Sequence, residues 1–106
     1  MRKEYKKLVR DRIPEIIRQN GIQCQVLTLT EVEYRQALRQ KLMEEAQEAA
    51  EASEANLVTE LADLYEVIDT LMKVYGIDRE LVLAEQEKRC SDRGGFEKRI
   101  QLLWTE

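Results

Sequence analysis

The chain has 106 residues, which suits one domain with a small core. Its formal net charge is −4, from 17 basic and 21 acidic residues, and this balance disfavours nonspecific binding of a nucleic-acid polymer. The sequence contains no histidine, which excludes a Ser-His-Asp or Cys-His catalytic system and any histidine-ligated metal site.

The two cysteines, Cys24 and Cys90, lie far apart and lack a CxxC spacing. A zinc site is therefore disfavoured, and the sequence predicts two free thiols, as is typical of a reducing cytosol. No apolar run approaches the ~20 residues that a membrane span needs, and the charged N-terminus lacks the apolar stretch of a signal peptide. We expect a cytoplasmic protein that does not enter a membrane, with a single domain over residues 1–106.

The segment before Thr30 predicts one short helix and an extended stretch. Residues 13–19 are expected to be helical, because Pro14 suits a first turn and Gly21 lies just past the end. Residues 22–29 alternate apolar and polar, which indicates extended chain and at most one marginal strand.

A capping box marks the start of a long helix. Thr30 is the expected N-cap and Glu33 follows three residues later, so the helix should run to about residue 53. Its apolar stripe comprises Leu38, Leu42, Ala46 and Ala49. Glu45 falls inside this stripe, and a carboxylate on a buried side needs a partner because burying it alone is costly.

A third helix is predicted from about residue 57 to 75, after a turn in which Asn56 is the expected N-cap. Its core stripe comprises Leu57, Leu61, Leu64, Ile68, Leu71 and Tyr75. Glu60 borders the stripe, and Asp63 lies on a line with Glu60 and Val67. Gly76 should end the helix.

A fourth helix is predicted over about residues 79–93, with Asp78 as its cap, Leu81 and Val82 facing inward, and glycines at its end. The remaining residues, 96–106, are too apolar for a free tail and should dock on the bundle or on a partner subunit. The fold class is therefore all-α: a bundle of about four helices, completed by oligomerisation because so short a chain has a small core.

Two consecutive helices each contain acidic residues three apart: Glu44, Glu45 and Glu48 in the first, Glu60 and Asp63 in the second. Side chains at i and i+3 share one helix face, and a short turn makes the helices antiparallel neighbours. Carboxylates that meet at one point repel each other unless a hard divalent cation lies among them, and oxygen-only ligands favour Mg²⁺ or Mn²⁺.

Without histidine, Glu44 or Glu48 is the candidate base or water-positioning group. The alternative interpretation is an ordinary solvated face, in which Lys41, four residues before Glu45, neutralises that carboxylate.

Basic residues gather at both ends of the chain. Arginine matches phosphate with two parallel hydrogen bonds, so as a set these residues are candidates for substrate phosphates, although each alone could be a solvated surface group. The candidates are Lys7, Arg10, Arg12, Arg89 and Arg93. The last two lie four apart on one helical face and could contact phosphates across a subunit boundary.

These motifs resemble the all-α nucleoside triphosphate pyrophosphohydrolases, a superfamily that includes MazG-like proteins, dimeric dUTPases and phosphoribosyl-ATP pyrophosphohydrolase. The acidic residues match an EExxE…ExxD signature. Residues 7–17 (KLVRDRIPEII) resemble the N-terminus of one MazG-like subgroup, residues 60–68 (ELADLYEVI) its third helix, and Lys88-Arg89 with Arg93-Gly94-Gly95-Phe96 its C-terminal motif.

The resemblance implies hydrolysis of a nucleotide between the α and β phosphates, giving a monophosphate and pyrophosphate. It implies a homodimer or homotetramer, and Mg²⁺, with Mn²⁺ as a possible substitute. The implied ligands are Glu45, Glu48, Glu60 and Asp63, with Glu44 close by.

Three functions stay open at this point. The first is a house-cleaning enzyme for noncanonical nucleoside triphosphates, and the second is a phosphoribosyl-ATP pyrophosphohydrolase of histidine biosynthesis. The third is a non-catalytic helical oligomerisation or regulatory module whose acids are only solvated.

Overall fold

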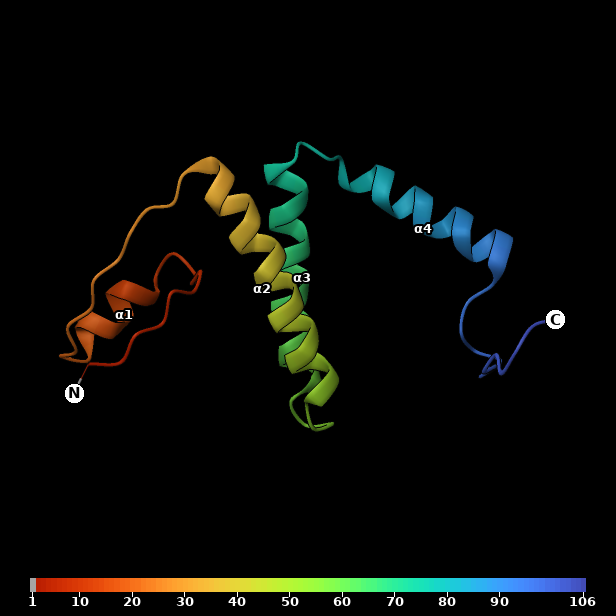
Figure 1. Ribbon diagram of the computed structural model, residues 1–106, viewed down its shortest axis with the longest axis horizontal. Coiled ribbons are helices and arrows are strands. Elements are labelled where there is room, and N and C mark those ends of the chain that lie inside the picture. The colour runs from red at the N-terminus through yellow and green to blue at the C-terminus, as the bar shows by residue number, and fades with distance from the viewer. Residues whose placement is uncertain (1) are drawn as a thin grey trace.

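The computed structural model describes residues 2–106, and this part of the chain contains four helices and no strand (Figure 1). The helices are α1 (Ile13–Gln19), α2 (Glu31–Glu51), α3 (Leu57–Val74) and α4 (Arg79–Arg93). The all-α class with four helices is confirmed. Residues 22–29 form no strand, which agrees with the prediction of at most one marginal strand, because the described chain offers that segment no second strand to pair with.

The helix boundaries follow local capping chemistry in most places. Thr30 and Glu33 form the predicted box: the Glu33 N–H donates to Thr30 Oγ1 at 3.2 Å, and the Thr30 N–H donates to Glu33 Oε1 at 3.0 Å. Asp78 accepts a hydrogen bond from the Glu80 N–H at 3.1 Å. Gly76, just after α3, has φ 64°, a left-handed conformation that glycine adopts without strain.

Two boundaries differ in detail from the prediction, although Asn56 is the N-cap of α3 as expected. The Asn56 side chain makes no capping hydrogen bond, because its backbone is already in a helical conformation (φ −101°, ψ −5°) instead of the extended one that capping requires. The long helix α2 ends at Glu51, slightly before the predicted end at about residue 53, since Ala52 turns to extended backbone (ψ 145°).

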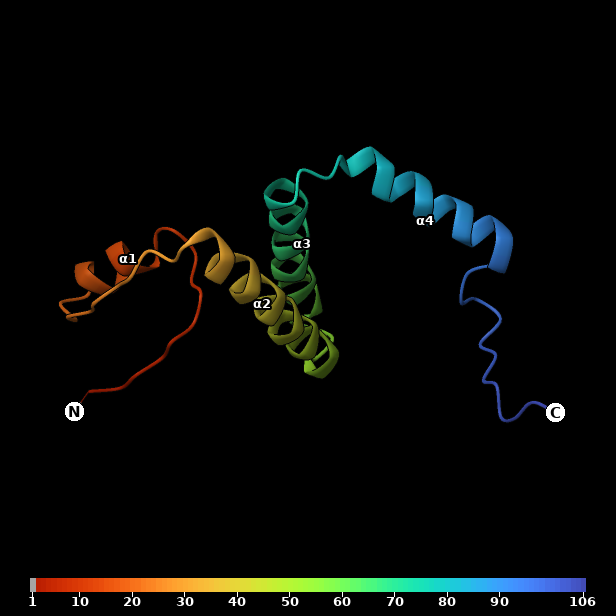
Figure 2. The same ribbon diagram turned by 45° about the horizontal axis from the view of Figure 1, so that its top comes forward.

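The centre of the molecule is an antiparallel hairpin of α2 and α3, joined by a short turn (Figure 1). On either side of this hairpin lie α1 and α4, and a second view shows the same separation (Figure 2). The described chain is accordingly elongated, with extents of 58 × 33 × 27 Å. None of its helices within residues 2–106 is long and apolar enough to cross a membrane.

The hairpin buries little. Leu38 of α2 and Val67 of α3 are its buried apolar residues, 3% and 8% exposed. The predicted leucine stripe of α3 is covered only in part: Leu57 and Leu61 are exposed, and the rest of the stripe is half-buried. Its last residue, Tyr75, contacts α2 by accepting a hydrogen bond from Arg39 Nε at 3.0 Å. Val67 belongs to the line that contains Glu60 and Asp63, so α3 turns its acidic line toward α2 and leaves its most apolar face partly uncovered.

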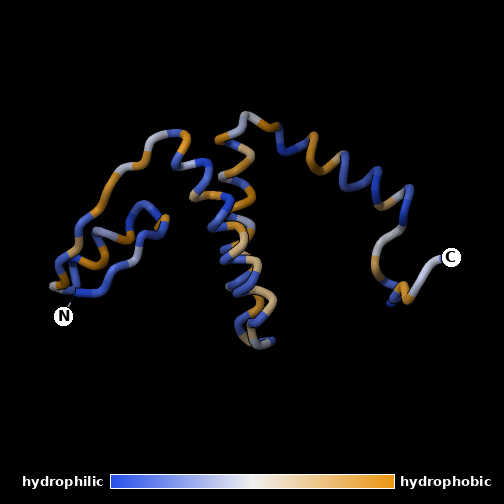
Figure 3. The backbone as a smooth tube through the Cα atoms, in the orientation of Figure 1, coloured by the Kyte–Doolittle hydropathy of each residue, from blue (hydrophilic) through white to orange (hydrophobic). Residues whose placement is uncertain are grey.

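The C-terminal part is also uncovered, and it contains apolar residues that alternate with polar ones along α4 and recur in the tail (Figure 3). Leu81 and Val82 of α4 are exposed, which contradicts the prediction that they face inward within the chain. Phe96 and Trp104 are 98% and 71% exposed, so the tail does not dock on its own hairpin. Apolar surface of this extent is typical of an interaction surface, which leaves a partner subunit as the remaining prediction for the tail.

Candidate functional site

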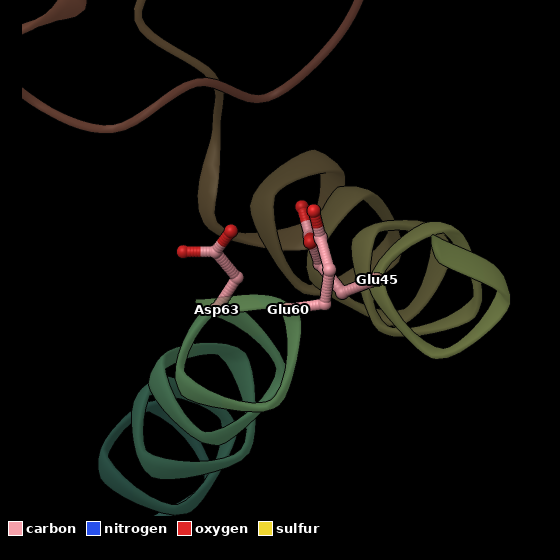
Figure 4. A group of neighbouring side chains, drawn as sticks. All are labelled: Glu45, Glu60 and Asp63. Carbon is pink, nitrogen blue, oxygen red and sulfur yellow. The ribbon is translucent and has the colours of Figure 1, made fainter. Parts of the chain in front are cut away.

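Three carboxylates converge where α2 faces α3. Glu45 comes from α2, and Glu60 and Asp63 come from successive turns of α3 (Figure 4). One oxygen of each carboxylate lies within 4.8 Å of one oxygen of the other two. We call these three residues the acidic cluster. The i, i+3 spacing on α3 and the position of Glu45 in the apolar stripe of α2 together produce it.

The acidic cluster lacks internal partners for two of its oxygens. Glu45 is 8% exposed, and its Oε2 atom is buried without a hydrogen-bond partner. The Oε2 atom of Glu60 is in the same situation. A buried carboxylate oxygen that receives no hydrogen bond is costly, so a positive group at this position would stabilise the charged form of the cluster.

Electrostatics in the acidic cluster favour the neutral carboxyl. Burial raises the pKa of Glu45 above its ordinary value, and the neighbouring Glu48 and Asp63 raise it further, while Lys41 opposes the shift. The pKa of Glu60 is also raised, first by burial and then by Glu48 and Asp63. Glu48 therefore lies close to both glutamates, although its own side chain is exposed.

A magnesium ion fits this arrangement. Oxygens bound to one octahedral Mg²⁺ lie about 3.0 Å apart when adjacent and about 4.2 Å apart when opposite, since each Mg–O distance is about 2.1 Å. The oxygens of the acidic cluster lie within 4.8 Å of one another, so side-chain rotations would have to bring them closer together around the ion. The donors are all carboxylate oxygens, which Mg²⁺ and Mn²⁺ accept.

Glu44, the other predicted catalytic residue, is not one of the three residues of the acidic cluster. It is half-buried and accepts a hydrogen bond from Lys41 Nζ at 3.3 Å. The same ammonium lies 3.7 Å from Glu45 Oε1, so Lys41 is a counter-ion for one edge of the acidic cluster. The i, i+3 and i, i+4 spacing from Lys41 makes both contacts possible within α2.

Of the predicted phosphate-binding residues, only Arg10 contacts the acidic cluster. Its Nη2 atom donates to Asp63 Oδ1 at 2.7 Å. Arg12 instead pairs with Glu15 at 3.3 Å, and Lys7 is exposed. Nothing in the sequence indicated the Arg10 contact, because the two residues are 53 positions apart.

The C-terminal pair lies away from the acidic cluster of its own chain, because α4 projects from the hairpin (Figures 1 and 2). Arg89 pairs with Glu85 at 3.4 Å. Arg89 and Arg93 also line an open groove at the end of α4, together with Gly94, Gly95 and Phe96. In this arrangement, Arg89 and Arg93 do not reach the acidic cluster of their own chain.

A comparison with protein families decides the class of the chain. The family model described as phosphoribosyl-ATP pyrophosphohydrolase matches residues 2–90, which include α1, α2, α3 and most of α4. The chain belongs to this family. No significant similarity to a curated protein or to a solved structure was found.

Membership of the phosphoribosyl-ATP pyrophosphohydrolase family confirms two predictions from the sequence. The chain is a MazG-like all-α protein, and it is a hydrolase that acts on phosphoric anhydrides. The matched region contains the whole acidic cluster, so the feature that the structure singles out lies within the segment that defines the family.

Repulsion within the acidic cluster predicts that Glu45→Gln stabilises the metal-free protein. The amide has nearly the same shape, removes one charge and can donate to a neighbouring carboxylate. We expect the Tm at neutral pH to rise, by about 4–8 °C for each ~1 kcal/mol of repulsion relieved in a domain of this size.

The pH dependence supplies the control for Glu45→Gln. Because the folded-state pKa of Glu45 is raised, the folded protein binds a proton more readily than the unfolded chain, so wild-type stability should increase as the pH falls through that pKa toward 4.5. The difference in Tm between Glu45→Gln and the wild type should therefore become smaller over the same pH range. Calorimetry in the presence of a chelator measures both, and an unchanged or lower Tm at neutral pH would contradict the clustered geometry.

Proposed function

We propose that this pyrophosphohydrolase depends on Mg²⁺ and cleaves a nucleotide between its α and β phosphates, giving a monophosphate and pyrophosphate. The observation that supports this most is the acidic cluster: three converging carboxylates with two buried oxygens that no protein group satisfies. We also propose a single catalytic domain over residues 1–106 and a cytoplasmic location.

In the proposed site, Glu45, Glu60 and Asp63 hold the metal, with Glu48 as a fourth ligand at the exposed edge. A bound Mg²⁺ would neutralise phosphate charge and lower the pKa of a water molecule. Glu48 is near the cluster yet open to solvent, which suits a group that orients the attacking water and accepts its proton. Glu44, which precedes Glu45 in the chain, would help Glu48 to orient this water once it no longer accepts the hydrogen bond from Lys41.

We propose two candidate substrates for this reaction. The first candidate is a noncanonical nucleoside triphosphate, removed in a house-cleaning role, which contains the required α–β anhydride bond. The second candidate is phosphoribosyl-ATP, which contains the same bond and which the family match supports. Both reactions would use the same metal site and would differ in the pocket that receives the base and sugar. The non-catalytic module is disfavoured, because it leaves the buried, unsatisfied oxygens of Glu45 and Glu60 without a reason.

We further propose a homodimer or homotetramer. The partly uncovered stripe of α3 and the exposed apolar residues of α4 and the tail support it, because a stable chain does not leave so much apolar surface in water. In such an assembly, Arg89 and Arg93 would reach the substrate of a neighbouring subunit, while Lys7, Arg10 and Arg12 would contact phosphates from within the subunit.

The proposal is tested by a pyrophosphate-release assay over unmodified and modified nucleoside triphosphates and phosphoribosyl-ATP, each with Mg²⁺, with Mn²⁺ and with a chelator. We expect turnover of at least one substrate, lost with the chelator and restored by either ion. The products distinguish the bond cleaved: a monophosphate with pyrophosphate supports the α–β position. Orthophosphate with a diphosphate, or no turnover of any substrate, would contradict the proposed function.

A further inference from the structure

One ion pair ties the N-terminal segment to the candidate metal site. Arg10 donates to Asp63 Oδ1 at 2.7 Å, and among residues 2–106 this is the one hydrogen bond between the segment before α1 and the α2–α3 hairpin. Figure 4 shows the N-terminal chain passing beside the cluster. Arg10 and Asp63 keep 59% and 36% of their side-chain surface exposed, so the pair lies on the open side of the site.

Charge at this site is only partly balanced. Glu45, Glu48, Glu60 and Asp63 bring four carboxylates together, whereas the protein cations in contact with them are Arg10 and Lys41. The two cations are held differently. Lys41 belongs to α2 itself, one turn from Glu45, and so it stays with that carboxylate. Arg10 extends from a segment without regular secondary structure and has no other recorded partner on the hairpin.

We propose that Arg10 is a temporary counter-ion of the acidic cluster, which a divalent cation displaces from Asp63 and so frees to bind a phosphate of the substrate. The inference rests on the proposed function. It assigns to this chain an order of events in which the metal binds first and prepares the arginine for the nucleotide.

Two physical reasons favour displacement over a lasting Arg10–Asp63 pair. A doubly charged ion within the cluster repels a guanidinium only a few ångströms away, and it also competes for the oxygens of Asp63. The pair that must break is exposed, and such pairs contribute only about 0.2–1 kcal/mol. Once free, the guanidinium is next to any phosphate that joins the metal, and its planar fork can form two parallel hydrogen bonds to that phosphate.

The first test is the affinity for Mn²⁺ without nucleotide, measured by titration calorimetry or by electron paramagnetic resonance. Arg10→Met removes the competing cation but keeps an unbranched side chain with a comparable apolar stem. If Arg10 must leave, the variant should bind Mn²⁺ about 1.4- to 5-fold more tightly, which is the range that an exposed ion pair supplies. The matched control is Arg12→Met, which makes the same charge change two residues away but breaks the pair with Glu15 instead. Its affinity for Mn²⁺ in the absence of nucleotide should stay close to that of the wild type.

The second readout is the side-chain ¹⁵N–¹H signal of Arg10, assigned through its loss in Arg10→Met. In metal-free protein the guanidinium held by Asp63 should give a distinct signal, and Mg²⁺ should return it to the position of a solvated arginine. Unchanged or weaker Mn²⁺ binding by Arg10→Met, or an Arg10 signal that Mg²⁺ leaves in place, would overturn the inference while the metal site stands. If wild-type protein binds no Mn²⁺ at all, both this inference and the proposed metal site fall.

Discussion

Replacing Glu60 with glutamine is expected to reduce the rate of pyrophosphate release about 100-fold or more, because a metal site supplies several kcal/mol of transition-state stabilisation. Glu60 supplies one of the two buried oxygens that no protein group satisfies, and the amide that replaces it is a poor ligand for Mg²⁺. The helices should stay folded, since the two side chains have nearly the same shape and the change relieves repulsion from Glu48 and Asp63.

The matched control for Glu60→Gln is Glu54→Gln, an identical substitution in the exposed turn between α2 and α3. It should leave both the rate and the Mn²⁺ affinity close to wild type. Rates are measured at saturating Mg²⁺, and circular dichroism verifies that both variants are helical. A folded Glu60→Gln variant with near wild-type turnover would exclude this cluster as the catalytic metal site.

The sequence predicts the elements of this fold well where local chemistry decides them. Thr30 and Glu33 determine the start of α2 by hydrogen bonds that their own spacing makes possible. The burial of Glu45 also follows from its place in an apolar stripe, and Glu45 meets Glu60 because a short turn forces α2 and α3 to be neighbours. These features depend on residues that are close in sequence or on the same hairpin.

The periodicity of apolar residues does not predict which face of a helix is buried when this depends on what packs against that face. The leucine stripe of α3 is the most apolar face of that helix, yet α2 packs against the line that contains Val67 and Glu60. A pattern indicates which face avoids water, but not whether the same chain or another subunit covers it. The same reason explains the exposed Phe96 and Trp104, which were expected to be covered.

Polar contacts between residues far apart in the chain are a second kind of feature that the sequence did not reveal. Arg10 and Asp63 were assigned to different tasks, phosphate binding and metal binding, and the structure joins them in one ion pair. Both assignments can hold in succession, because an exposed pair is weak enough to exchange partners. The sequence motif suggests the two roles, and the contact between Arg10 and Asp63 suggests the order in which they occur: the metal binds first and the phosphate second.

Mixing two inactive variants should restore activity if the site is shared between subunits. Glu60→Gln removes a metal ligand, and the double substitution Arg89→Met/Arg93→Met removes the cations of α4, which lies away from the acidic cluster of its own chain (Figure 1). Each variant alone should be nearly inactive. In a twofold symmetric dimer, random exchange of subunits makes half of the dimers mixed, and each mixed dimer has one intact site, so about a quarter of wild-type activity should return.

The measurement is pyrophosphate release after the two variants are unfolded together and refolded, compared with each variant refolded alone. Mixing Glu60→Gln with Asp63→Asn is the matched control, because both changes damage the acidic cluster and no mixed dimer regains an intact one. Full activity in the double arginine variant would remove Arg89 and Arg93 from the site. Loss of activity in that variant without recovery on mixing would mean that these arginines serve the acidic cluster of their own chain, and that α4 folds back onto the hairpin when substrate binds.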